Sequence, residues 1–174
     1  AYIPKDENYA LLQQAAEKSK VKMMFLEPGE GLGIGPVEIT CLLPDQTMTK
    51  EDRNDLSLVL SMKWNGGSGL FVGDISQEVE EYLLQQGKLN DVSIYKVSHH
   101  GSKYSNSLEL LETIKPEIAL VSSGKWNLYG HPHKDTLDRL EMVGARVYNT
   151  GWVGQITIGI RKNGSGYLHL PMLE

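Results

Sequence analysis

GLFVGDISQEVEEYLLQQGKLNDVSIYKVSHH, residues 69–100, contains the unit that decides the fold. Apolar residues over 69–72 predict a strand that ends at a Gly-Asp pair. Over 76–86, apolar positions recur every three to four residues between a serine N-cap and the stop signal Gly87, which predicts an amphipathic helix. The apolar run over 92–97 returns as a strand. The stretch is therefore a β-α-β unit, which is typical of layered α/β proteins.

The same alternation of strands and helices extends in both directions. Downstream, we expect helices over 107–114 and 134–143, strands over 118–121 and 146–148, and a closing hairpin of 156–160 with 167–170. Upstream, we expect a helix over 7–18, strands over 21–26 and 37–43, a turn region over 27–35, and a hairpin of 56–64 with 69–72. No repeat, low-complexity segment or linker is visible, so residues 1–174 are predicted to form one domain.

Composition narrows the possible functions. A chain of 174 residues with 40% hydrophobic residues can build one ordinary core. It contains no apolar run of about 18 residues and no signal-peptide pattern. The single cysteine, Cys41, can form no intrachain disulfide. A net charge of -5 opposes long-range attraction to nucleic acid, so any DNA contact must be local.

Four of the five histidines and one aspartate follow the ends of predicted strands. They are Asp74, His99, His100, His131 and His133. In a layered α/β fold, ligand sites form at the carboxyl ends of strands, so we expect these side chains to converge in one pocket or groove. Imidazole nitrogen and carboxylate oxygen bind zinc or manganese, and a carboxylate can bridge two metals that share a nucleophilic hydroxide. The pattern favours a metal-dependent hydrolytic site.

Each of these motifs also has a purely structural interpretation. Asp74 can cap the helix that begins near Ser76, the His-His-Gly-Ser run can form a polar turn, and the His-Pro-His run can form a rigid loop that starts a helix. Adjacent histidines between an apolar strand and a glycine are uncommon without a purpose, which favours the functional interpretation. His169, in the closing hairpin, is expected to be structural.

Four segments together carry a resemblance to a known family. They are NDLSLVL at 54–60, FVGD at 71–74, VSHHGS at 97–102 and YGHPH at 129–133. In this order and spacing, they resemble the metallo-β-lactamase-like domain of ComEC-type DNA-internalisation competence proteins. Each motif alone is modest, but the ordered set is specific and covers nearly the whole chain. The resemblance implies an α/β fold that is the C-terminal part of a metallo-β-lactamase-type αββα sandwich.

The resemblance also implies roles for single residues. These are metal ligation for Asp74, His99 and His100, catalysis for His131 and His133, and substrate binding for Asn54, Ser57 and Ser102. Asp74 would bridge the metals, and one of the two adjacent histidines would be the late histidine ligand. His131 and His133 would hold substrate phosphate or a metal. Zinc or manganese is the cofactor expected in the intact domain.

One expected motif is missing from the sequence. The superfamily's first metal motif, His-x-His-x-Asp-His, is absent, and the run HPHKDT at 131–136 comes too late in the order to replace it. We therefore expect an excised, inactive piece of the domain, with Ala1 as a cloning remnant, that holds metal weakly or not at all. Its uncovered sheet edges and apolar face should favour self-association.

Three functions compete at this point. The favoured one is hydrolysis of phosphodiester bonds in single-stranded or duplex DNA. The intact domain would be a soluble part of a bacterial cell-membrane protein, attached to a transmembrane channel, with the extracytoplasmic side favoured. A phosphorylcholine esterase or another phosphodiesterase is the second, and it would need an aromatic cage from Trp64, Trp126, Tyr129 and Trp152. A catalytically lost docking module on the channel is the third, favoured if no metal motif lies upstream.

Overall fold

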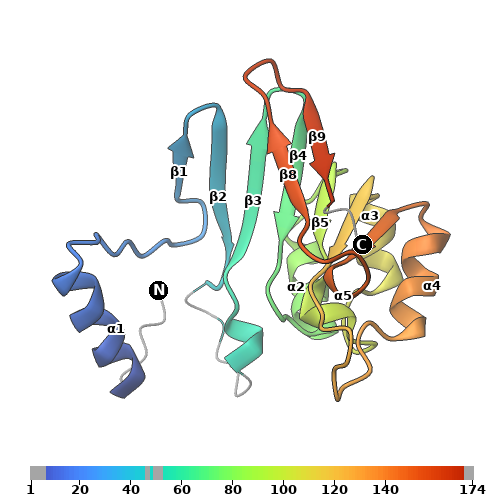
Figure 1. Cartoon of the computed structure of the whole chain (residues 1–174), viewed down its shortest axis with the longest axis horizontal. Coiled ribbons are helices and arrows are strands. Elements are labelled where there is room, and N and C mark those ends of the chain that lie inside the picture. The colour runs from blue at the N-terminus through green and yellow to red at the C-terminus, as the bar shows by residue number, and fades with distance from the viewer. Residues whose placement is uncertain (1–6, 46–47, 49–52, 171–174) are drawn as a thin grey trace.

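A seven-stranded mixed sheet forms the centre of the computed structural model, which describes residues 7–45, 48 and 53–170 (Figure 1). Its strands are β1 (Gly31–Ile34), β2 (Val37–Leu43), β3 (Val59–Trp64), β4 (Gly67–Phe71), β5 (Ile94–Lys96), β6 (Ile118–Val121) and β7 (Arg146–Asn149). They lie side by side in chain order, antiparallel from β1 to β4 and parallel from β4 to β7. The first half is a meander, and the second half is built from crossovers.

Helices supply the crossovers of the parallel half. They are α2 (Gln77–Gln85) between β4 and β5, α3 (Leu108–Ile114) between β5 and β6, and α4 (Lys134–Met142) between β6 and β7. Their apolar residues and those of the strands form the buried core, which includes Val79, Leu83, Tyr95, Leu111 and Leu140. These crossovers leave the carboxyl ends of β4, β5 and β6 at one edge of the sheet, where three loops meet.

One face of the sheet meets the hairpin of β8 (Thr157–Ile160) and β9 (Gly166–His169). Ile94 and Ile118 of the sheet and Ile158 of the hairpin line a hollow of about 400 Å³ between them. A short helix, α5 (Thr150–Val153), connects β7 to this hairpin. None of the helices among the described residues is long and apolar enough to cross a membrane.

The α/β class expected from the sequence is confirmed, with one large mixed sheet and flanking helices. Expected elements form at nearly the predicted positions from β2 to β9, and the helix predicted over 7–18 is α1 (Glu7–Lys18). Differences at their ends amount to one or two residues, except that β3 begins at Val59 and a 3₁₀ turn, η1 (Arg53–Leu56), precedes it. Helix α5 was not expected, because four residues carry no periodic pattern.

Two expectations in the N-terminal region are wrong. Residues 21–26 form no strand, and Val21, Met24 and Phe25 remain exposed, because none of the strands in the described part of the chain pairs with this segment. The expected turn region instead contains β1, which pairs antiparallel with β2. A Cβ on Gly31 would lie 2.0 Å from the Ile39 carbonyl oxygen, so this glycine serves close strand pairing and does not mark a turn.

Helix α1 buries none of its residues and stands apart from the sheet (Figure 1). Leu11 and Leu12 on its surface are each 56% exposed. Strand β1 is an outer strand of the described sheet. The N-terminal part of the described chain therefore presents both exposed apolar side chains and an open strand edge, the two features that favour association.

Candidate active site

Three loops at the carboxyl ends of the parallel strands bring the predicted side chains together. Asp74 follows β4, the adjacent histidines follow β5 in the turn η2 (Ser98–Gly101), and the His-Pro-His run follows β6. Since β4, β5 and β6 are parallel neighbours, these loops lie at the same edge of the sheet. The topology thus places residues far apart in sequence around one position.

The side chains form a continuous cluster. His100 Nε2 lies 3.5 Å from Asp74 Oδ2. The ring centroid of His131 lies 5.9 Å from that of His99, 6.4 Å from that of His100 and 4.8 Å from that of His133. All five residues are therefore neighbours, while their individual roles stay predictions.

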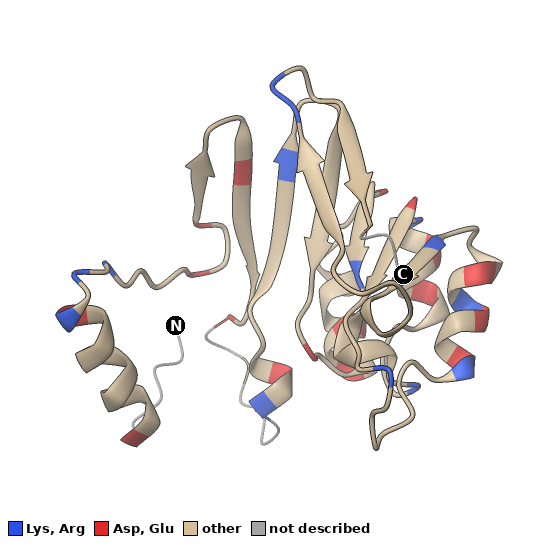
Figure 2. Cartoon of the chain, viewed as in Figure 1, with Lys and Arg blue, Asp and Glu red and all other residues tan. Residues whose placement is uncertain are grey.

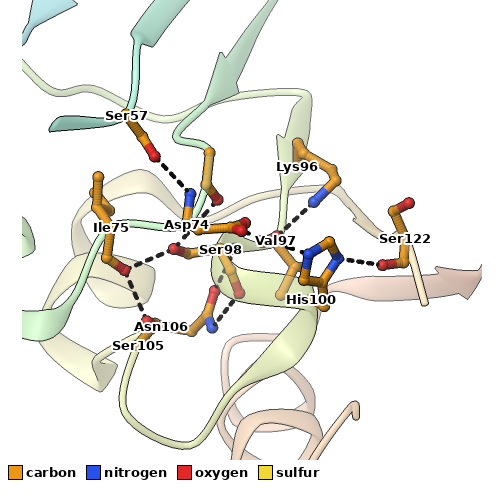
Figure 3. A network of polar contacts seen from close by, with 11 residues as sticks. Ser57, Asp74, Ile75, Lys96, Val97, Ser98, His100, Ser105, Asn106 and Ser122 are labelled. Atoms are coloured by element: carbon orange, nitrogen blue, oxygen red, sulfur yellow. Dashed lines mark hydrogen bonds and ion pairs between the residues drawn. The ribbon is translucent and has the colours of Figure 1, made fainter. Parts of the chain in front are cut away.

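His100 is the histidine of the adjacent pair that faces Asp74. Its Nδ1 lies 2.6 Å from the backbone carbonyl oxygen of Ser122, which can only accept a hydrogen bond (Figure 3). Nδ1 therefore carries a proton, and in the neutral form of the ring Nε2 presents a lone pair toward Asp74. A histidine whose second ring nitrogen bonds to a carbonyl group is the usual arrangement of a metal ligand. The geometry favours His100 over His99 for that role.

The backbone of this turn is in an uncommon conformation. His99 has φ 47° and His100 has φ 55°, both in the left-handed region. Such residues cost of order 1–3 kcal/mol each and persist only where the surroundings hold them. A Cβ on Gly101 would lie 2.5 Å from Pro132 Cβ, so the turn also packs tightly against the His-Pro-His loop. The pair of histidines is thus presented by a constrained turn.

Asn106 holds both ends of the turn from below (Figure 3). Its Oδ1 accepts hydrogen bonds from Ser98 N and from the Tyr95 hydroxyl, each at 2.9 Å. Its Nδ2 donates to the carbonyl oxygens of Ser98, at 3.1 Å, and Ser102, at 3.4 Å. All these residues are buried, and water does not reach their polar groups. These hydrogen bonds within the protein therefore satisfy groups that would otherwise have no partner. Asn106 therefore acts as a clamp on the histidine turn.

Glu80 of α2 supports this clamp in turn. Its carboxylate accepts from the backbone N–H groups of Asn106, at 2.5 Å, and Ser107, at 2.7 Å. Burial raises the pKa of Glu80, and the backbone hydrogen bonds from Ser107 and Asn106 oppose that rise. Helix α2 and the start of α3 are thereby joined beneath the site. Sequence reasoning missed both Glu80 and Asn106, because polar residues near helix starts look like ordinary caps.

Three serine side chains hydrogen-bond to the backbone of the loop that contains Asp74. Ser57 Oγ accepts from Asp74 N at 3.1 Å, and the hydroxyls of Ser98 and Ser105 donate to the Ile75 carbonyl at 2.8 Å and 2.7 Å. A Cβ on Gly73, which has φ 61°, would lie 2.6 Å from Ser57 Cβ. The N-cap of α2 is Ser76, so the helix-capping interpretation of Asp74 does not hold.

The three residues predicted to bind substrate occupy different surroundings. The Ser57 hydroxyl contacts the Asp74 backbone, as described above. Ser102 is buried, its hydroxyl accepts from Tyr104 N at 3.3 Å, and its carbonyl accepts from the Thr136 hydroxyl at 2.9 Å. Asn54 is exposed on η1. Ser57 and Ser102 therefore hydrogen-bond within the chain, Asn54 is accessible to solvent, and substrate binding by the three residues stays a prediction.

Two groups with shifted pKa values border the cluster. Burial lowers the pKa of His131, and the imidazoles of His133, His99 and His100 lower it further, so the ring is neutral at pH 7. Burial also lowers the pKa of Lys96, while Asp74 opposes that change. The Lys96 ammonium donates to the Val97 carbonyl at 2.8 Å. The site therefore contains the neutral ring of His131 beside one carboxylate and one lysine.

Asp74 and His100 offer one oxygen and one nitrogen donor that face each other. Within the described ranges, no group of three or more His, Cys, Asp or Glu side chains has the geometry to hold a metal ion. A catalytic zinc site uses about three protein ligands plus water. The donor types therefore suit zinc or manganese, and the described residues bring two such donors face to face, fewer than a catalytic zinc site uses.

Comparison with known proteins identifies relatives of the chain. No protein-family model matches it. ComE operon protein 3 of Bacillus subtilis is 33% identical over 153 residues, 88% of this chain. Recombination protein 2 of Haemophilus influenzae is 33% identical over 117 residues, 67% of this chain, and competence protein ComA of Neisseria gonorrhoeae is 31% identical over 129 residues, 74% of this chain. The chain spans 19%, 14% and 18% of these relatives, respectively.

A solved structure shares the fold. It is a candidate metal-dependent hydrolase of Parabacteroides distasonis, with a TM-score of 0.50 and 16% sequence identity over 84% of this chain and 62% of the other. The chain therefore shares the mixed α/β fold of this protein. The relatives identify the family. The chain belongs to the ComEC-type competence proteins and corresponds to their metallo-β-lactamase-like domain.

Proposed function

We propose that this chain forms one side of an active site that hydrolyses phosphodiester bonds in DNA, within a competence protein. The observation that carries the proposal is the contact between His100 Nε2 and Asp74 Oδ2, with the His100 ring fixed by the Ser122 carbonyl. The names of the relatives, which include competence and recombination proteins, support DNA as the substrate. A hydrolase-type fold supports hydrolysis as the chemistry.

Asp74 and His100 would hold a zinc or manganese ion, together with ligands from outside the described residues. Such an ion supplies a water of lowered pKa and neutralises charge on the phosphate. The neutral ring of His131 can donate an N–H hydrogen bond to a phosphate oxygen, and His133 lies beside it for the same purpose. The buried clamp of Asn106 would keep these groups in place during the reaction.

We propose further that the domain works on the extracytoplasmic side of the membrane, beside a transmembrane channel of the same protein, with single-stranded or duplex DNA as partner. The name of one relative, competence protein ComA, supports competence as the process, while the membrane side and the channel rest on the resemblance of the sequence motifs. The phosphorylcholine alternative receives no support from the aromatic residues. Trp64 lines the hollow beside the closing hairpin, Trp152 belongs to α5, and Trp126 and Tyr129 belong to the loop before α4, so the four come from three regions.

The test measures cleavage of end-labelled DNA by the protein as it occurs in the cell, with zinc or manganese added. We expect metal-dependent cleavage that falls at least about 100-fold in Asp74→Asn, because one lost ligand weakens both the metal and its orientation. Asp91→Asn is the matched control, since Asp91 is exposed and lies outside the cluster. If the wild type cleaves no DNA with either metal, the result would favour the alternative that the domain is a docking module without catalysis. If Asp74→Asn still cleaves DNA, the cluster around Asp74 is not the active site.

A further inference from the structure

The loop between β6 and α4 presents large side chains to solvent beside the histidine cluster. Trp126 is 90% exposed, Leu128 101% and Tyr129 78%. Tyr104, which follows the histidine turn in the chain, is 69% exposed. Side chains of this size rarely project fully into water together unless they contact a ligand.

Hydrogen bonds hold the backbone of this loop in place. The Asn127 amide donates to the carbonyl oxygens of Gly124, at 2.9 Å, and His131, at 2.7 Å, and its Oδ1 accepts from His131 N at 2.8 Å. At the start of the loop, the Thr150 hydroxyl bonds to Ser123 N, at 3.0 Å, and to the Ser123 carbonyl, at 2.9 Å. A preorganised loop loses little entropy when a ligand binds.

Each aromatic group lies beside a cation or a histidine of the cluster. The Lys125 ammonium is 5.9 Å from the centroid of the Trp126 ring, and the Lys103 ammonium is 5.2 Å from that of Tyr104. Lys103 N also donates to His133 Nδ1 at 3.1 Å, so this pair adjoins the cluster directly.

Tyr129 continues into the cluster by stacking. Its ring lies 5.8 Å from that of His131 at an interplanar angle of 24°, and the His131 ring lies 6.4 Å from that of His100 at 19°. A planar group placed on Tyr129 would therefore be next to the residues proposed to hold the phosphate.

We infer that Trp126, Tyr129 and Tyr104, with Lys125 and Lys103, form a binding surface for single-stranded nucleic acid. Unpaired bases stack on the aromatic rings, and the two ammonium groups beside those rings contact phosphates. Stacking aromatic residues interleaved with cations are the chemistry by which proteins bind single strands without sequence preference. This inference rests on the proposed function, because it names the form of DNA that the same site accepts.

Charge argues for an anionic ligand at this surface. Two rings already have lysine ammonium groups of their own chain nearby, so they are poorly suited to a choline-like cation. Figure 2 shows Lys and Arg interspersed with Asp and Glu along the chain. Attraction of phosphate groups must therefore come from Lys103 and Lys125 beside the aromatic rings. A duplex would hide its bases from the rings, which makes single strands the better partner.

Fluorescence anisotropy of a labelled oligothymidylate of about 12 nucleotides, within the size range of single-strand sites, tests the surface. The 174-residue chain is used in EDTA, so that binding is measured without cleavage. We expect Trp126→Ala and Tyr129→Ala each to weaken binding about 10-fold, and Lys125→Gln to lower the salt-dependence slope by about 0.7. A duplex of the same length should bind more weakly than the single strand.

Tyr167→Ala is the matched control, because Tyr167 is a 47% exposed tyrosine with the Arg161 guanidinium 4.8 Å from its ring, on the closing hairpin. Equal effects of Tyr167→Ala and Trp126→Ala would overturn the inference. So would the absence of single-strand binding, or Trp126-dependent binding to zwitterionic lipid vesicles in its place. Loss of DNA cleavage with single-strand binding retained would count against the proposed function alone. Loss of binding in a protein that still cleaves would count against this surface alone.

Discussion

His100 is held between two oxygen atoms, with Nδ1 2.6 Å from the Ser122 carbonyl oxygen and Nε2 3.5 Å from Asp74 Oδ2. His99 precedes it in the chain, but its ring centroid lies 6.4 Å from that of His100 and 5.9 Å from that of His131. His100 thus contacts Asp74 and Ser122 directly, so the same substitution at His99 and at His100 should have different effects on metal binding.

We predict that the 174-residue chain binds zinc weakly and that His100 carries this binding. Two facing donors fall short of the about three protein ligands of a catalytic site. Titration calorimetry should show that His100→Gln weakens the residual affinity by at least about 10-fold and that His99→Gln changes it far less. Tight, stoichiometric binding by the wild type, or a larger loss in His99→Gln, would contradict the assignment.

Asn106→Ala should lower the free energy of unfolding by about 3 kcal/mol, because it leaves several buried groups without hydrogen-bond partners. Urea unfolding followed by circular dichroism measures the change. Asn90→Ala is the control, since Asn90 is exposed and should change stability by less than about 0.5 kcal/mol. A loss in Asn106→Ala no larger than in the control would show that Asn106 does not clamp the histidine turn.

Glu80 predicts a specific dependence of stability on pH. Burial raises the pKa of its carboxyl group in the folded state, so folding favours the protonated form. Its stabilising contribution is complete below the ordinary glutamate pKa and declines as pH rises through the raised value. The free energy of unfolding of the wild type, relative to Glu80→Gln, should therefore fall as pH increases across that window. A difference that is constant or rises with pH would refute this explanation.

The exposed apolar residues near the N-terminus of the described chain lead us to expect self-association. Leu11 and Leu12 lie on a helix that buries nothing, and Met24 and Phe25 follow it in an exposed segment. Light scattering over a range of concentrations should show a mass that rises with concentration, and Leu11→Ser with Leu12→Ser should reduce the rise. A monomer at every concentration would exclude association through this region.

Much of the fold could be predicted from the sequence, because its signals are local. Periodic apolar residues locate α2 and α4, and the positions of Asp74 and His100 after parallel strands predict that they converge. Strand β1 could not be predicted, since its glycines resemble a turn and its stability comes from pairing with β2.

The finer parts of the site depend on contacts that are distant in sequence. The choice between His99 and His100 follows from two left-handed residues and a carbonyl at Ser122, on another strand end. Asn106 reaches Ser98 only because the chain turns back beneath the histidines. A pattern read along the chain contains neither relationship.

Oxygen-isotope labelling of the cleavage product tests the central claim most directly. The protein as it occurs in the cell is incubated with DNA and manganese in water enriched in ¹⁸O, and the terminal phosphate of the product is analysed by mass spectrometry. If water attacks phosphorus at the site of Asp74 and His100, the wild type places one ¹⁸O atom in each new phosphate, and Asp74→Asn forms at least about 100-fold less of this labelled product in the same time. Product without ¹⁸O, or an equal amount of labelled product from Asp74→Asn, would contradict the account.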